Sequence, residues 1–89
     1  MQMTDQQQTI EQDVRQFVIS NFLFGEDNGS LTANESFLES GIIDSTGVLE
    51  LVSFLEQTYG IKVRDEELVP DNLDSLQKVA AFVQRKAGR

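Results

Sequence analysis

The chain has 89 residues, a formal net charge of −8, and neither cysteine nor histidine. A chain of this length is expected to form one small domain with one modest core, so we treat residues 1–89 as a single standalone protein. The missing cysteines exclude disulfides and thiolate metal sites, and the missing histidines remove the usual general base and the commonest metal ligand. The composition therefore predicts a protein that is not an enzyme.

Charge is distributed unevenly along the sequence. Residues 1–60 contain ten acidic side chains and only Arg15 against them, a balance of −9, whereas residues 61–89 contain six basic and five acidic side chains, a balance of +1. This surface would repel nucleic acid and attract basic patches on other proteins, or its acidity serves solubility alone. No segment has the length or composition of a membrane span or a signal peptide. We expect a cytoplasmic monomer without nucleic-acid or membrane partners.

The first predicted helix covers about residues 5–24, with Thr4 or Asp5 as N-cap and Gly25 as the stop. The apolar residues that recur at helical spacing in this segment are Ile10, Val14, Phe17 and Val18. Residues 25–44 are rich in glycine, asparagine and serine, which predicts a long loop. Such a loop is usually functional or packed by its own apolar side chains.

The second predicted helix covers residues 45–59, capped by Asp44 and terminated by Gly60. Its apolar side chains form a band too wide for one narrow stripe, which is typical of a central helix with several neighbours. The band consists of Val48, Leu49, Leu51, Val52, Phe54 and Leu55. We expect only a small pocket beside this helix, because the apolar residues around it are bulky.

The last third of the chain predicts two further helices. A short helical turn is expected over residues 65–69, closed by Pro70. A final helix is expected over residues 74–86, with Asp74 or Asn72 as its cap. The predicted fold is therefore all-α: four helices with a long loop after the first and a short third helix.

The Asp44-Ser45 step is the most informative local feature. Alone, Asp-Ser before a helix is an ordinary capping signal. Here Gly41 bends the chain and an apolar pair, Ile42 and Ile43, follows it before the cap. This order holds one serine hydroxyl outward at a helix N-terminus, where backbone N–H groups and the helix dipole favour a phosphate. Ser75 follows Asp74 but lacks such an approach, so we interpret Asp74 only as a cap.

Three segments resemble acyl and peptidyl carrier proteins. Residues 37–45 (FLESGIIDS) are similar to their attachment region, residues 49–61 (LELVSFLEQTYGI) to their second helix, and residues 67–76 (ELVPDNLDSL) to the junction of their third and fourth helices. The resemblance covers over half of the chain, and the first helix and the loop agree in pattern only. It implies a four-helix bundle of the acyl-carrier-protein type.

The resemblance also implies a chemistry. In such proteins the serine matching Ser45 receives 4′-phosphopantetheine from coenzyme A, through a separate Mg²⁺-dependent phosphopantetheinyl transferase. The terminal thiol then carries a cargo as a thioester between an activating ligase and a downstream acceptor enzyme. The aspartate matching Asp44 commonly takes part in recognition by the transferase. A chain without cysteine cannot form a thioester on its own sulfur, so the prosthetic group supplies what the composition lacks.

The residues after Ser45 indicate the partners and the cargo. Val48 and Glu50 resemble the face that basic partner enzymes recognise, and Glu56 resembles it less clearly, because a solvated helix face also explains it. Fatty-acid carriers usually have leucine and an acidic residue after the serine, whereas Thr46 and Gly47 follow here. Glycine in a first helical turn costs up to about 1 kcal/mol relative to alanine, which suggests that a partner or the prosthetic arm approaches closely there.

The motif is most similar to discrete aminoacyl and D-alanyl carrier proteins, which predicts a small aminoacyl cargo. A carrier of the fatty-acid or polyketide type is the alternative within the family. Outside the family, an unmodified acidic helical interaction module remains open. Calcium binding by a loop starting at Phe24 is disfavoured, because phenylalanine offers no oxygen ligand at the first position.

Overall fold

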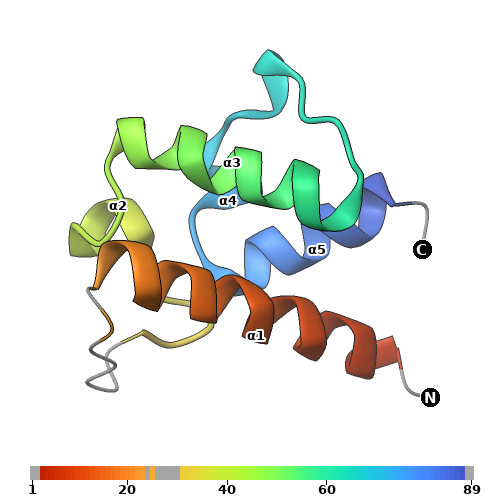
Figure 1. Ribbon diagram of the computed structural model, residues 1–89, viewed down its shortest axis with the longest axis horizontal. Helices are drawn as coiled ribbons and strands as arrows, with labels where there is room; N and C mark the ends of the chain where they lie inside the picture. Colours follow the sequence, from red (N-terminus) through yellow and green to blue (C-terminus); the bar gives the residue numbers. More distant parts are fainter. Residues whose placement is uncertain (1–2, 24, 26–30, 88–89) are drawn as a thin grey trace.

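The structure, a computed structural model, describes residues 3–23, 25 and 31–87. In these residues it contains helices and turns but no strand, which confirms the all-α prediction (Figure 1). The elements are α1 (Met3–Phe22), α2 (Phe37–Ser40), α3 (Ser45–Tyr59), the 3₁₀ turn η1 (Asp65–Glu67), α4 (Pro70–Leu73) and α5 (Leu76–Lys86).

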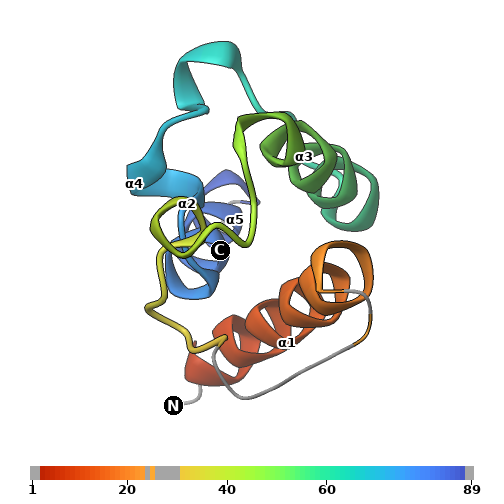
Figure 2. The same cartoon turned by 90° about the vertical axis from the view of Figure 1, so that its left-hand side faces the viewer.

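The three long helices enclose the interior. α1 and α3 lie side by side and run in opposite directions, and α5 packs against α1 (Figures 1 and 2). The C-terminal end of α1, the short helix α2 and the N-terminal end of α3 therefore meet at one end of the molecule, on the left in Figure 1. This arrangement places the predicted Asp44-Ser45 step where three segments of the chain converge.

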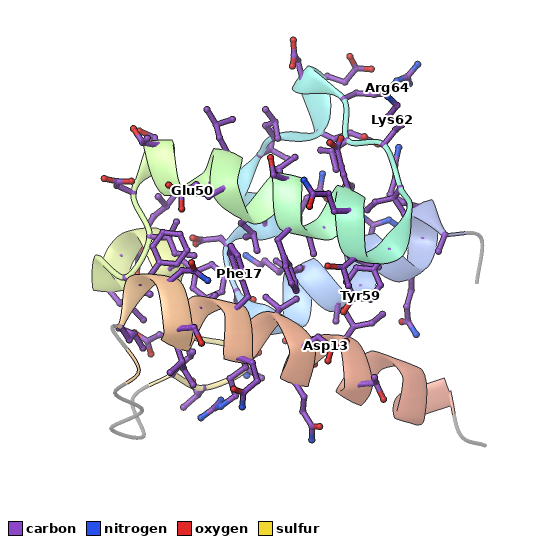
Figure 3. The ribbon with its side chains drawn as sticks, viewed as in Figure 1. Asp13, Phe17, Glu50, Tyr59, Lys62 and Arg64 are labelled. Carbon is purple, nitrogen blue, oxygen red and sulfur yellow. The ribbon has the colours of Figure 1, made fainter. Side chains whose placement is uncertain are left out.

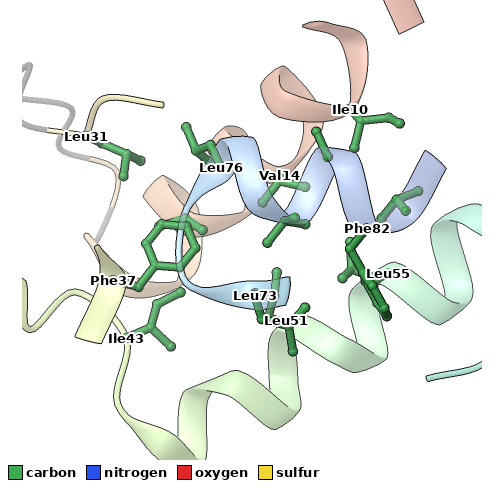
Figure 4. Close-up of a cluster of buried hydrophobic side chains, with 14 of the residues drawn as sticks. Ile10, Val14, Leu31, Phe37, Ile43, Leu51, Leu55, Leu73, Leu76 and Phe82 are labelled. Atoms are coloured by element: carbon green, nitrogen blue, oxygen red, sulfur yellow. The ribbon is translucent and has the colours of Figure 1, made fainter. Parts of the chain in front are cut away.

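The core is one continuous apolar cluster (Figure 4). Val14, Leu51, Leu55 and Val79 are fully buried, and they come from all three long helices. The segment between α1 and α3 adds Leu31, Phe37 and Ile43, each 1% exposed, which confirms that these side chains are packed against the core. Leu38, which we expected to pack there too, is 44% exposed. Burying this much apolar surface is what orders a segment that the sequence alone assigns to loop.

The structure corrects the boundaries at the start of the chain. α1 already includes Thr4 and Asp5, so neither of them caps it, and it ends at Phe22 rather than at residue 24. Gly25 still ends the helical path, because its φ of 83° is accessible mainly to glycine and its N–H bonds to the Ile19 carbonyl at 2.8 Å. The loop predicted over residues 25–44 contains the helix α2, which is too short to show a periodic pattern.

Two corrections concern the last third. The turn predicted over residues 65–69 is shorter, and Pro70 begins α4 as its first residue instead of only closing the turn, since proline suits a first helical position. The final helix starts at Leu76, and its cap is Ser75, whose hydroxyl accepts from the Lys78 N–H at 3.1 Å. Asn72 and Asp74 do not cap it.

None of the helices in the described part of the chain is both long and apolar enough to cross a membrane.

Glu67 ties η1 to the end of α5. Its carboxylate accepts the backbone N–H of Arg64 at 2.9 Å and pairs with the Lys86 ammonium at 3.0 Å. The hydrogen bond from Arg64 and then the contact with Lys86 hold the pKa of Glu67 below its usual value. This pairing fixes the turn that follows α3 against the C-terminal helix.

We expect Leu55→Ala to lower the free energy of unfolding by about 3 kcal/mol, because it removes a fully buried side chain and leaves a cavity. Leu49→Ala on the same helix is the matched control. Leu49 is 57% exposed, so its truncation should change the stability by no more than about 0.5 kcal/mol. Urea denaturation followed by circular dichroism measures both. Equal losses in the two variants would contradict this core.

We expect Glu67→Gln to lower the urea midpoint at pH 7, and the difference from wild type to shrink in acid. A carboxylate with a lowered folded-state pKa stabilises the fold fully above its ordinary value of 4.5 and loses this contribution as the pH falls through the folded-state value. Urea midpoints at pH 7, 5, 4 and 3 test this. The control is Glu66→Gln. The Glu66 side chain is 74% exposed, so this variant should have the urea midpoint of wild type at every pH. A Glu67→Gln difference independent of pH would contradict the assignment.

Candidate functional site

The first turn of α3 is built around Asp44. Its backbone is extended, with φ −96° and ψ −176°, and its carboxylate accepts the Gly47 N–H at 2.8 Å, so the predicted cap is confirmed. The Asp44 carbonyl accepts the Val48 N–H at 3.1 Å and begins the helical ladder. Ser45 is the first helical residue and is exposed. The N–H groups of Ser45 and Thr46 have no preceding carbonyl within the helix, so they are the donors that an anion beside Ser45 would meet.

A sharp bend brings the chain into this turn. Gly41 ends α2 with a φ of 77°, a left-handed conformation that favours glycine, and its N–H bonds to the Leu38 carbonyl at 3.2 Å. Ile43 is buried and donates its N–H to the Phe37 carbonyl at 3.3 Å. The predicted roles of Gly41 as the bend and Ile43 as the apolar contact are therefore confirmed, and together they leave Asp44 and Ser45 at the surface.

Asp74, which lies between α4 and α5, holds α2 in place. One carboxylate oxygen accepts the Ser36 hydroxyl and the other accepts the Leu38 N–H at 3.0 Å. The Asp74 carbonyl also accepts the Phe37 N–H at 2.8 Å. The prediction that Asp74 caps the last helix was therefore wrong: it binds the start of α2 instead. No local pattern gives this contact, because the partners are far apart in the sequence.

The predicted partner-binding residues occupy different environments. Thr46 and Glu50 are exposed on the same end of α3 as Ser45, and Figure 3 shows Glu50 at this end. Val48 is half-buried and borders an apolar groove of about 50 Å³ towards α4. Glu56 is also half-buried, and its carboxylate accepts the Val63 N–H at 2.9 Å, so it serves the fold and not simply a solvated face.

The structure gives a different reason for the glycine at position 47 than the close approach of a partner or the prosthetic arm. The residue is buried, and a Cβ atom built on it would lie 2.7 Å from the Phe22 ring and 2.9 Å from Ile43. The space left by its missing side chain is therefore filled from inside the protein, and neither a partner nor a prosthetic arm needs it. Phe22 is a residue that the sequence analysis missed, because it lies outside the apolar stripe of α1.

Two surfaces flank the first turn of α3. On the α1 side is an open hollow, and its lining residues are Phe22, Gly41, Ile42, Asp44, Thr46, Gly47 and Glu50. On the α4 side is the apolar groove, and its lining residues are Phe37, Leu38, Val48, Leu68, Val69, Pro70, Leu73 and Asp74. The first surface carries two carboxylates, whereas the second is almost entirely apolar.

Exposed apolar side chains near the site were also missed. Among the described residues the exposed large hydrophobic side chains are Leu38, Leu49 and Val69. Leu38 and Val69 border the groove, and Leu49 lies one helical turn after Ser45. The sequence could have shown this, because residues four apart lie on the same face of a helix and Ser45 was expected to be exposed. The assignment of Leu49 to the buried band of α3 was wrong.

The described residues contain no group of three or more histidine, cysteine, aspartate or glutamate side chains able to hold a metal ion. The calcium loop considered above begins at Phe24, and half of it lies outside the residues that the structure describes.

A comparison with protein families matches residues 23–83 to the family described as "Phosphopantetheine attachment site". The matched range contains the whole of α2, α3, η1 and α4 and most of α5, so it includes the Asp44-Ser45 turn.

Named relatives agree with this match. The chain is 32% identical over 76 residues to a probable acyl carrier protein PigG from a Serratia species, covering 85% of this chain and 86% of the relative. It is 31% identical over 80 residues to an acyl carrier protein of Akkermansia muciniphila, covering 90% and 95%. A D-alanyl carrier protein of Streptococcus pyogenes is 34% identical over 62 residues, covering 70% and 77%. The chain therefore belongs to the acyl carrier protein family and functions with a covalently attached 4′-phosphopantetheine.

Proposed function

We propose that Ser45 is the residue that bears 4′-phosphopantetheine, as a phosphodiester on its hydroxyl oxygen. The observation that carries this proposal is the exposed position of Ser45 as the first residue of α3. A phosphodiester there would lie beside the unpaired N–H groups and the positive end of the helix dipole. The bound arm supplies a thiol, the group that a chain without cysteine needs to carry a thioester.

Other serines near this end suit the role less well. Ser75 is 3% exposed and caps α5. Ser36 donates its hydroxyl to Asp74, and Ser40 donates its hydroxyl to the Ser36 carbonyl at 2.7 Å. Ser53 is exposed but lies in the middle of α3, where backbone N–H groups are already used by the helix. Only Ser45 in this set combines exposure with a helix N-terminus.

Asp44 has two roles in this proposal. Its carboxylate caps α3 and thereby fixes the turn that presents Ser45. Because the side chain is also exposed, its charge is accessible to a phosphopantetheinyl transferase, for which we propose it is a recognition element. Thr46, Leu49 and Glu50 surround Ser45 on the exposed side of α3 and form the proposed contact surface for basic partner enzymes.

We further propose that the cargo is small and aminoacyl, delivered by an amino acid-activating ligase and passed to an acceptor enzyme. Gly47 no longer supports this cargo, since its space is occupied by Phe22. The support is instead the small groove beside Val48, of about 50 Å³. Similarity to a D-alanyl carrier protein agrees with a small cargo.

We expect wild type, incubated with coenzyme A, Mg²⁺ and a phosphopantetheinyl transferase, to gain the mass of one phosphopantetheine. Ser45→Ala should gain nothing, because it lacks the acceptor oxygen. Ser53→Ala is the matched control, an exposed serine of the same helix, and should be modified like wild type. Intact-mass spectrometry measures all three. An unmodified wild type would support the unmodified interaction module instead, and modification of Ser45→Ala would place the arm elsewhere.

We expect the holo protein to be charged by an amino acid-activating ligase with ATP and a small amino acid, and not by a transferase of long fatty acyl groups. The reason is the limited groove beside Val48. Intact mass before and after mild hydroxylamine treatment identifies a thioester, and the Ser45→Ala protein serves as the blank. Efficient charging with long acyl chains alone would establish the fatty-acid type of carrier.

A further inference from the structure

The end of α1 packs directly on the turn that carries Ser45. The Phe22 ring occupies the space where residue 47 would carry a side chain: a Cβ atom there would be 2.7 Å from Phe22 Cε1 and 3.2 Å from Phe22 Cζ. Ile43 Cγ2, at 2.9 Å, closes the same space from the approach to the helix. Real Cβ atoms essentially never approach another heavy atom this closely, so only glycine fits at position 47 with the neighbours where they are.

Phe22 is itself held by a row of aromatic side chains along the seam between α1 and α3. Its ring meets Phe17 edge-on, with centroids 6.0 Å apart, and Phe17 stacks on Phe54 at 4.4 Å. Phe54 meets Tyr59 edge-on at 6.4 Å, and the Tyr59 hydroxyl donates to Asp13 at 2.9 Å. Figure 3 shows Phe17, Tyr59 and Asp13 along this seam. Phe22 is thus linked through Phe17 to the ring of Phe54 on α3.

The row ends in the hydrogen bond from Tyr59 to Asp13. Burial first, and then the hydrogen bond to Asp13 and its negative charge, raise the pKa of Tyr59 above its usual value. The phenol therefore keeps its proton, and with it this hydrogen bond, to a higher pH than a free tyrosine would.

Two constraints converge on Gly47. The Asp44 carboxylate binds its N–H at 2.8 Å, and the Phe22 ring covers its Cα. Ser45 and Thr46 lie between Asp44 and Gly47, so a displacement at either end of this turn displaces the Ser45 hydroxyl. The helix propensity lost by placing glycine in the turn is offset by the close packing that it permits.

We propose that Phe22 is a positioning residue for the modification of Ser45, acting through Gly47. This inference rests on the proposed attachment at Ser45. Phe22 does not need to touch coenzyme A or the transferase: its ring fixes the first turn of α3, and the turn fixes the direction of the hydroxyl. A correctly placed nucleophile matters to the rate because errors of about 1 Å in position cost up to roughly 100-fold.

The test compares Gly47→Ala, Phe22→Leu and the double variant in the phosphopantetheinylation assay, with initial rates at varied carrier concentration. Gly47→Ala adds a methyl group where the ring lies, and Phe22→Leu removes the ring. Each should lower kcat by about 10-fold, with KM changed by less than about twofold, because the lost interaction orients Ser45 in the transition state and leaves the docking surface intact.

The double variant separates positioning from general destabilisation. Leucine at position 22 leaves room for the added methyl group, so the double variant should be at least about threefold faster than Gly47→Ala. Phe82→Leu is the matched control: it removes a buried ring from α5, outside the aromatic row that holds Phe22. It should lose thermal stability like Phe22→Leu and keep the wild-type kcat. Circular dichroism confirms that each protein is folded at the assay temperature.

Amide chemical shifts give a second readout in the unmodified protein. Phe22→Leu and Gly47→Ala should shift the Ser45 and Thr46 N–H resonances, whereas Phe82→Leu should leave them in place. If Gly47→Ala does not fold, the comparison of Phe22→Leu with Phe82→Leu decides alone.

Three results would overturn the positioning role: wild-type kcat in Phe22→Leu, equal losses of kcat in Phe22→Leu and Phe82→Leu, or a double variant slower than Gly47→Ala. Failure of the attachment proposal is distinct, since it appears as a wild type that is not modified at Ser45 when the modified peptide is sequenced by mass spectrometry.

Discussion

The close approach of α1 to α3 at Gly47 is the constraint on which the turn around Ser45 depends. A ring from α1 can lie on the first turn of α3 only because residue 47 has no side chain. The same residue supplies the N–H that the Asp44 carboxylate binds. Packing and capping thus act on a single backbone position next to Ser45. Flexible prosthetic arms need a rigid origin, because any motion at the attachment point adds to that of the arm itself.

On the α5 side, polar contacts hold the end of the molecule that carries Ser45. Asp74 binds the start of α2 through two side-chain hydrogen bonds and one from its carbonyl, so the turn between α4 and α5 determines where α2 lies. α2 in turn ends at Gly41, from which the chain descends to Asp44. Apolar contacts on the α1 side and polar contacts on the α5 side therefore position one exposed turn.

The start of α3 is acidic. Asp44 and Glu50 are exposed around the start of α3, whereas Lys62 and Arg64 follow its far end, as Figure 3 shows for Glu50 and the two basic residues. The exposed carboxylates of Asp44 and Glu50 attract basic partners to the end that carries Ser45, whereas the far end mixes basic side chains with the exposed Asp65 and Glu66. Leu38, Leu49 and Val69 add exposed apolar area near the end that carries Ser45, which such partners can bury.

Local sequence patterns were sufficient to predict the bounds of α3. Asp44 and Gly60 bound α3 as predicted, since a cap and a left-handed glycine act within one turn of the chain. The sequence by itself determined the all-α class and the exposed serine after an aspartate cap, and its motifs pointed to the carrier family. Only the tertiary structure decided that α2 forms, that Ser75 and not Asp74 caps α5, and that Gly47 is filled by Phe22. Each of these depends on a contact between residues distant in the sequence, and no periodicity or capping rule encodes which distant side chain fills a given space.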